Sequence, residues 1–262
     1  MNISSEKLLI SNQQDEKMAG VFHRAGEKKE VVIVCHGLTG NKDGNFIPRL
    51  CDALVKSGVN AFRFDFSGNG QSEGEFKKST YTKEIEDLKS VVDYFHNKNF
   101  RKICIIGTSQ GVAICVLEAV KDTRINFVVS VAGVAYPQRF VQRFCGWNNI
   151  SQEELREKLK KDGFIKYRKR DGRKFNLAKD FFDDIVKYYP INEVKNIKAP
   201  SLFIHGDQDD SIDIQESRDM FGAANEPKEL FILKGANHIF SDLEKEAGMI
   251  KKSIEWIKNV LK

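Results

Sequence analysis

Short apolar runs alternate with longer stretches of helical periodicity along most of the chain. The runs at 31–35, 60–66, 102–106 and 127–134 are continuous enough to predict strands buried on both faces of a sheet. Before the third of these runs, residues 80–97 repeat apolar side chains every three or four positions, which predicts an amphipathic helix. This alternation predicts an α/β fold with a mostly parallel sheet and helices on both faces.

The two ends of the chain extend this pattern. Two apolar runs at 7–11 and 18–23 flank a polar stretch and predict an N-terminal antiparallel hairpin. Near the C-terminus, residues 201–205 and 229–233 predict two further strands. Helices are predicted at 46–57, near 215–224, and from about 243 to 261.

Residues from about 136 to 190 do not continue the alternation. Within them, 151–163 has the composition of a charged helix, and the runs at 164–167 and 170–175 predict a small hairpin around Asp171-Gly172. We expect residues 1–262 to fold as a single domain that carries the stretch at about 136–190 as an inserted lid.

The composition excludes several classes of protein. Hydrophobic residues make up 41% of the chain, which is enough for a packed core and argues against disorder. Neither a membrane-spanning stretch nor a signal peptide is apparent. The five cysteines have no C-x-x-C spacing, and three lie in apolar segments, which predicts reduced, buried thiols. We therefore expect a soluble, cytoplasmic protein without stable membrane insertion; formation of a homodimer is left open.

The charge is distributed unevenly. The net charge of +5 is too small in a chain rich in both signs to indicate nucleic-acid binding. Residues 151–174 contain ten Lys or Arg against five Asp or Glu, a surplus equal to that of the whole chain. A solvated face is the preferred interpretation of this surplus, and an entrance that attracts anionic substrates is the alternative.

The pentapeptide Gly107-Thr108-Ser109-Gln110-Gly111 follows the apolar run at 103–106. A G-x-S-x-G sequence at the end of a strand forms a sharp strand-to-helix turn that exposes the serine hydroxyl. Small residues are needed on both sides because this turn crowds the backbone. Ser109 is therefore the candidate nucleophile, although the pentapeptide alone is also compatible with an ordinary turn.

A serine hydroxyl needs an adjacent base, and the base needs a carboxylate that orients it. His238 follows the last predicted strand and is the candidate base. Asp207, Asp209 and Asp210 follow the strand at 201–205, and any one of them is a candidate acid or a cap for the next helix. The order Ser, Asp, His along the chain is the one expected for this architecture.

The transition state for attack by a serine on a carbonyl carbon also needs donors for the developing oxyanion. The backbone N–H of Gln110 is one candidate, and the N–H of Leu38, in the loop after the first buried strand, is the other. His36 and His205 each precede a glycine at a strand end, and we interpret both as side chains that organise loops. The glycine-rich stretch 67–72 does not match G-x-G-x-x-G, so we interpret it as scaffold and not as a nucleotide site.

Five motifs occur in a characteristic order: HGLTG, FDFSGNGQSEG, GTSQG, HGDQDD and GANHIFSD. This set resembles the α/β-hydrolase superfamily, and within it the bacterial cinnamoyl and feruloyl esterases and related small acyl hydrolases. The resemblance covers nearly the whole chain outside the predicted lid. It implies the α/β-hydrolase fold and a catalytic triad of Ser109, His238 and, through the pattern H-G-x-x-D, Asp209. It also places Leu38 and Gln110 at the oxyanion positions.

The resemblance implies a serine hydrolase that cleaves small or medium acyl or aryl carboxylic esters through an acyl-enzyme. It implies no metal and no organic cofactor. Serine aminopeptidases and lipid or thioester acyl hydrolases share the scaffold and are the first alternative. A non-catalytic binding protein on the same fold is the remote one. The predicted lid matches no motif of the family, so the substrate is left open.

Overall fold

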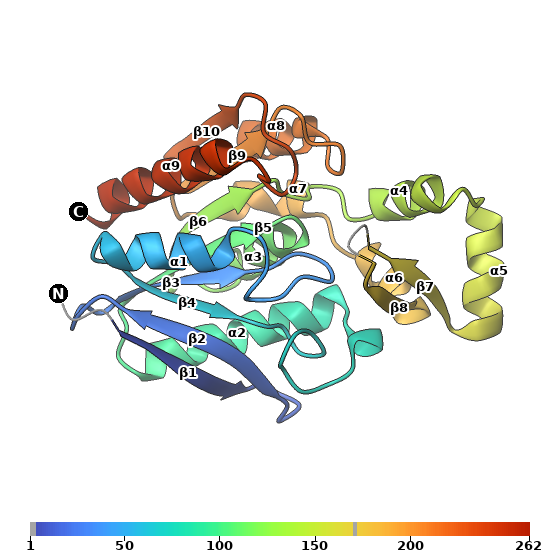
Figure 1. Cartoon of the computed structure of the whole chain (residues 1–262), viewed down its shortest axis with the longest axis horizontal. Helices are drawn as coiled ribbons and strands as arrows, with labels where there is room; N and C mark the ends of the chain where they lie inside the picture. Colours follow the sequence, from blue (N-terminus) through green and yellow to red (C-terminus); the bar gives the residue numbers. More distant parts are fainter. Residues whose placement is uncertain (1–3, 170–171) are drawn as a thin grey trace.

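The computed structural model describes residues 4–169 and 172–262. Within these ranges a central sheet of eight strands has the order β1-β2-β4-β3-β5-β6-β9-β10 (Figure 1). Strands β1 and β2 form the predicted antiparallel hairpin, and β2 also pairs antiparallel with β4. In the spatial order given above, every neighbouring pair from β4 to β10 is parallel. The bounds are β1 Ser4–Ser11, β2 Lys17–Arg24, β3 Glu30–Cys35, β4 Asn60–Phe64, β5 Lys102–Thr108, β6 Ile125–Val131, β9 Ser201–Gly206 and β10 Lys228–Leu233.

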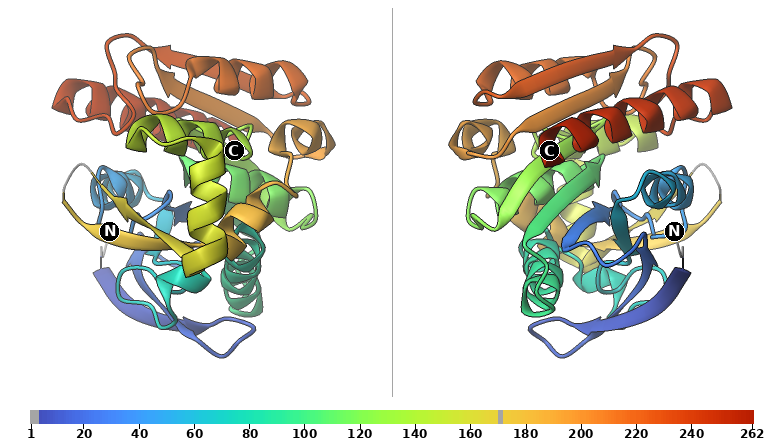
Figure 2. Two further views of the ribbon diagram at one scale, coloured as in Figure 1. Left: turned by 90° about the vertical axis from the view of Figure 1, so that its right-hand side faces the viewer. Right: turned by 90° about the vertical axis from the view of Figure 1, so that its left-hand side faces the viewer.

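Helices cover both faces of the sheet, as the alternation predicts. Helices α1 and α9 pack on one face, and α2, α3 and α8 pack on the other (Figure 2). The central strands are buried on both sides by these layers, which explains their continuous apolar runs. The bounds are α1 Ile47–Lys56, α2 Tyr81–Asn97, α3 Gln110–Ala119, α8 Ile214–Ala223 and α9 Leu243–Leu261, with a 3₁₀ turn η1 at Phe76–Lys78.

Residues 136–190, called the inserted segment below, leave the sheet after β6, and the chain returns to it at β9. The segment projects beyond one end of the sheet in Figure 1. Its buried side chains, such as Phe144 and Leu177, belong to the same apolar cluster as the α2 and α3 face of the sheet. Its elements are α4 Arg139–Asn148, α5 Gln152–Asp162, β7 Phe164–Arg168, β8 Lys174–Ala178 and α6 Lys179–Ile185; α7 Pro190–Glu193 and the 3₁₀ turn η2 Val194–Asn196 follow.

Several predicted strand bounds are wrong, among them the end of β4, which is Phe64 and not residue 66, and bounds of β6 and β8. Strand β6 ends at Val131 and not at residue 134, because Ala132 adopts a φ of 50°, which an extended strand does not accommodate. Strand β8 begins at Lys174 and not at 170, and it pairs Phe175 with Tyr167. The expected hairpin is present, but Arg170 and Asp171 of its expected turn lie outside the described residues.

Charged helix α5 begins one residue after and ends one residue before the predicted range 151–163, whose two end residues cap it. The Ser151 side chain accepts the N–H of Glu154, and the Glu154 carboxylate accepts the N–H of Ser151, so the first turn carries a complete capping box. Gly163 ends the helix with a left-handed φ of 73°. In the part of the chain that the structure describes, no helix combines the length and the apolar character needed to cross a membrane.

Candidate active site

Ser109 lies at the junction of β5 and α3, with φ 55° and ψ −122°. A non-glycine residue rarely adopts a positive φ, so this backbone is strained and must be held by its surroundings. The Ser109 N–H donates to the carbonyl of Val131 at 3.0 Å, and the Ser109 carbonyl accepts the N–H of Val112 at 3.1 Å. The junction therefore forms the predicted sharp turn at the carboxyl end of β5.

Both glycines of the pentapeptide are required by the close approach of neighbouring backbone. A Cβ atom on Gly107 would lie 2.5 Å from the carbonyl oxygen of Gly111, and one on Gly111 would lie 2.6 Å from the carbonyl oxygen of Cys35. Real Cβ contacts essentially never come below 3.0 Å. The G-x-S-x-G spacing thus follows from the packing of α3 against the ends of β3 and β5.

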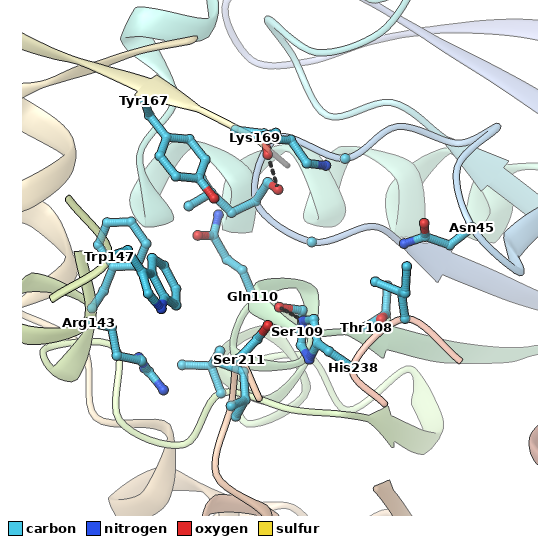
Figure 3. A pocket seen from close by; sticks show the side chains of 18 of the residues that line it. Asn45, Thr108, Ser109, Gln110, Arg143, Trp147, Tyr167, Lys169, Ser211 and His238 are labelled. Atoms are coloured by element: carbon cyan, nitrogen blue, oxygen red, sulfur yellow. Dashed lines mark hydrogen bonds between the residues drawn. The ribbon is translucent and has the colours of Figure 1, made fainter. Parts of the chain in front are cut away.

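The structure brings Ser109, His238 and Asp209 together. His238 Nε2 lies 3.1 Å from Ser109 Oγ (Figure 3), and His238 Nδ1 lies 2.7 Å from Asp209 Oδ2. Their loops follow β5, β9 and β10, and the carboxyl ends of these parallel strands meet at one edge of the sheet. With its proton on Nδ1 donated to the carboxylate, His238 presents Nε2 as the acceptor for the serine hydroxyl.

The carboxylate of Asp209 is buried and surrounded by donors. Oδ1 accepts the N–H groups of Ser211 at 2.8 Å and Ile212 at 2.9 Å, while Oδ2 faces both His238 and His205. Burial alone would raise the pKa of Asp209, but the hydrogen bonds from His205 and His238 outweigh it and hold that pKa well below its usual range. The acid is therefore ionised at neutral pH.

The neighbouring acids have other partners. Asp207 Oδ1 accepts the N–H of Gly235 at 2.6 Å, and Asp210 Oδ1 accepts the hydroxyl of Ser211 at 3.1 Å. Helix α8 is capped by Asp213, whose side chain accepts the N–H of Gln215, so neither Asp207 nor Asp210 has the alternative capping role. Of the three acids that the sequence left open, Asp209 supplies the 2.7 Å contact to His238.

His205 contributes more than loop organisation. This fully buried histidine has Nε2 3.0 Å from Asp209 Oδ2 and 3.1 Å from the Ile212 carbonyl oxygen, and Nδ1 2.7 Å from Ser217 Oγ. Two acceptors at Nε2 require the proton to be there, so Nδ1 accepts the Ser217 hydroxyl. Sequence reasoning missed this role, although the signal, a histidine four residues before the acid, was present.

Leu38 and Gln110 both line the pocket that contains Ser109. Gln110 begins α3, where the first N–H groups have no intrahelical partner. A Cβ on Gly37 would lie 2.9 Å from Ser109 Cβ, so glycine permits the loop before Leu38 to approach the serine. His36 fixes this loop, with Nδ1 2.9 Å from the Gly37 carbonyl and Nε2 accepting the Phe66 N–H at 3.1 Å.

A buried acid lies behind Gln110 that sequence reasoning did not single out. Glu84 of α2 accepts a hydrogen bond from the Gln110 side chain at 2.8 Å and another from the Ser79 hydroxyl at 2.9 Å. Burial raises the pKa of Glu84 to about 7, although these two hydrogen bonds oppose the shift. In the sequence, Glu84 had no feature that distinguished it from other polar positions of an amphipathic helix.

The glycine-rich stretch at 67–72 lies against the loop that follows β3. Asp65 is fully buried and accepts the backbone N–H of Lys42 at 2.6 Å and of Gln71 at 2.8 Å, while the Lys42 ammonium lies 3.0 Å from it. Because Lys42 belongs to the same loop as Leu38, this buried ion pair helps to fix one side of the candidate oxyanion hole. The glycine-rich stretch therefore acts as scaffold for the neighbouring loop.

The pocket at Ser109 and His238 has a volume of about 700 Å³. Its walls are largely apolar, and the inserted segment provides much of them (Figure 3). The apolar lining residues include Leu38, Tyr81, Val134, Phe140, Trp147, Phe181, Ile212 and Ile239.

Comparisons with known proteins agree with this fold. Among curated proteins, the chain is similar to the uncharacterized protein YfhR of Salmonella typhimurium, 26% identical over 222 residues that cover 83% of this chain and 67% of YfhR. This chain spans about half to two thirds of the length of the first curated relatives that it matches.

Solved structures show the same architecture at low sequence identity. Est1E from Butyrivibrio proteoclasticus, solved with ferulic acid bound, matches with a TM-score of 0.82 and 21% identity over 97% of this chain and 99% of that chain. An esterase from Pyrococcus furiosus matches with a TM-score of 0.76 and 20% identity over 98% of this chain and 91% of that one. These matches confirm the predicted α/β-hydrolase fold.

The family assignment comes from the sequence itself. The model of a family described as serine aminopeptidase, S33, matches residues 26–245, which is most of the chain and includes Ser109, Asp209 and His238. The protein therefore belongs to the serine aminopeptidase S33 family of α/β-hydrolases.

Proposed function

We propose that this protein is a serine carboxylic-ester hydrolase that works through an acyl-enzyme. The observation that carries the proposal is the continuous chain of contacts from Ser109 Oγ through His238 to Asp209 Oδ2. Ser109 attacks the ester carbonyl while His238 Nε2 takes its proton and then gives it to the departing alcohol. Water, activated in turn by His238, cleaves the acyl-enzyme and regenerates Ser109.

Asp209 and two backbone N–H groups orient the reacting groups and stabilise the charges that form. Asp209 holds the His238 proton on Nδ1 and stabilises the imidazolium that forms during each step. The backbone N–H groups of Leu38 and Gln110 donate to the oxyanion of the tetrahedral intermediates. Side chains, backbone groups and water carry every step of this proposed mechanism.

The proposed substrates are small or medium acyl or aryl esters. The apolar walls of the pocket, including Phe140, Trp147 and Phe181, support this class because they would bury the acyl or aryl body of the substrate. The likeness to Est1E with bound ferulic acid and to the Pyrococcus furiosus esterase supports the same class. We propose that the inserted segment acts as the lid of this pocket.

The cytoplasm is the proposed location. All five cysteines are free and buried, which suits a reducing compartment.

Hydrolysis of 4-nitrophenyl butyrate, measured with the wild-type protein and the Ser109→Ala variant, tests the proposal. We expect turnover by the wild type and a loss of about three orders of magnitude or more in kcat for the variant, because the residual rate comes from binding and the oxyanion donors alone. Turnover that survives in Ser109→Ala would contradict the proposed nucleophile.

The description of the family favours one second candidate, a serine aminopeptidase. It predicts release of 4-nitroaniline from amino-acid anilides, and an esterase predicts release of 4-nitrophenol from simple acyl esters without appreciable anilide cleavage. Comparing the two substrate types with the same protein preparation decides between the candidates.

A further inference from the structure

The pocket that holds Ser109 has a strongly cationic rim. Among the described residues that line it, four are Lys or Arg and one is an acid, Asp210. One of the cations comes from α4 and the others from the hairpin of β7 and β8, so all four belong to the inserted segment. The four are Arg143, Arg168, Lys169 and Arg173.

The hairpin carries the larger part of this surplus. Residues 166–174 contain six Lys or Arg and one Asp in the sequence. Lys169 lines the edge of the pocket (Figure 3), on the side of the loop that contains His36 and Leu38. Burial lowers the pKa of His36 in that loop, and the positive charge of Lys169 adds to the decrease. The field near the candidate oxyanion hole thus has a positive contribution from the hairpin.

Arg143 is held in place on the pocket wall. Its Nη1 donates to Glu216 Oε1 at 2.9 Å, and the buried Glu216 carboxylate also accepts the N–H groups of Ala135 and Tyr136. Arg143 Nε is buried and has no hydrogen-bond partner among the described residues. Arg143 thus contributes a guanidinium that is already paired with Glu216, which Arg139 Nη1 also approaches at 3.6 Å, and the other three cations of the lining belong to the hairpin.

We propose that the preferred substrates are esters that carry a carboxylate, which the hairpin cations attract while the apolar walls hold the rest of the molecule. This inference rests on the proposed esterase function. Charges that line a cleft with apolar walls focus the field on whatever enters it, more than the same charges do on an open face. The combination of a surplus of cations with aromatic walls suits a mainly apolar molecule that carries a negative charge.

Matched esters test the inference. Mono-4-nitrophenyl adipate bears a free carboxylate, and its methyl ester has the same acyl length and leaving group without the charge. At low ionic strength we expect kcat/KM to favour the anionic ester by about fivefold. Added NaCl should bring the ratio toward one, since salt screens charges near the surface. A ratio of one or below at low salt would overturn the inference.

Two triple variants test whether the preference for the anionic ester comes from the hairpin cations. Arg168→Gln/Lys169→Gln/Arg173→Gln should lower the ratio of the two kcat/KM values toward one. The control, Lys158→Gln/Lys160→Gln/Lys161→Gln, removes the same charge from exposed positions of α5 that do not line the pocket, and it should keep the wild-type ratio. An equal decrease in both variants would mean that overall charge is responsible, which contradicts a pocket effect.

The methyl ester keeps the two proposals separate. If the wild type hydrolyses the methyl ester and Ser109→Ala does not, the esterase function stands whatever the preference for charge. Hydrolysis of the methyl ester without preference for the anionic ester overturns only the inference about the substrate. Absence of hydrolysis of both esters by folded wild type contradicts the proposed function itself.

Discussion

Asp209 receives hydrogen bonds from two histidines and two backbone N–H groups, although its side chain is almost completely buried. Such an environment stabilises a carboxylate without neutralising it. Because His205 and His238 approach the same oxygen, Oδ2, they share its negative charge. His205 is therefore a positioning residue in this account, acting on His238 only through Asp209.

Replacing His205 tests this role. In His205→Leu, Asp209 loses one of the donors that lower its pKa, so the Asp209–His238 pair as a whole should bind a proton more readily. The acidic limb of the pH profile of kcat/KM should then move to higher pH by about one unit. His205→Gln, whose amide can donate in the place of Nε2, should restore the wild-type profile. A profile that is unchanged in His205→Leu would rule out coupling through Asp209.

Glu84 gives a prediction for stability. Its pKa of about 7 in the folded protein lies above the ordinary value of 4.5, so the folded protein holds the proton more tightly than the unfolded chain does. The corresponding stability is fully present below pH 4.5 and is lost as the pH rises through 7. The loss is on the order of 3 kcal/mol, at about 1.4 kcal/mol per pH unit.

Urea unfolding of the wild type and of Glu84→Gln at pH 5 and pH 8 measures this contribution. Glutamine does not ionise, so the free energy of unfolding of the variant, relative to the wild type, should increase between the two pH values. Glu118, whose pKa burial also raises to about 7, is present in both proteins, so its effect cancels in the difference. A difference that does not change with pH would contradict the assignment to Glu84.

At the scale of elements, the turn between β5 and α3 depends on the small size of its glycines. In Gly111→Ala, the added Cβ meets the Cys35 carbonyl, and we expect a loss of about 1–3 kcal/mol in the free energy of unfolding. The control Gly222→Ala lies in α8, where an added Cβ meets nothing within 4 Å. It should be neutral or stabilising by up to about 1 kcal/mol. Equal effects in the two variants, measured by urea unfolding, would contradict the packing argument.

The sequence could predict those features that depend on residues close together along the chain. The turn at Ser109 was predictable because its glycines, strand and helix are local to one stretch of chain. The contact of Glu84 with Gln110 joins α2 to α3, and the bounds of β8 depend on pairing with β7, so neither follows from a local pattern. Periodicity predicted which elements form, and tertiary contacts decided where some of them end.

At the scale of the whole molecule, the parallel sheet brings loops from distant parts of the sequence to one edge. The succession of strands along the chain followed from hydrophobic periodicity, and the candidates Ser109, Asp209 and His238 followed from motifs, but neither predicted the chemistry of the pocket. The cations at 151–174 were visible in the sequence, yet only the three-dimensional arrangement separates exposed ones such as Lys160 from Lys169, which lines the pocket. The anionic-substrate alternative, which the sequence alone ranked second, is therefore the one that we propose.

In the proposed mechanism, Ser109 is activated by His238 and Asp209. Treating the folded protein with a fluorophosphonate and locating the adduct by peptide mass spectrometry tests it most directly. We expect one phosphonyl group on Ser109, with labelling abolished in Ser109→Ala and slowed in Asp209→Asn by at least about tenfold. Labelling of another residue, or folded wild-type protein that does not react, would contradict the account.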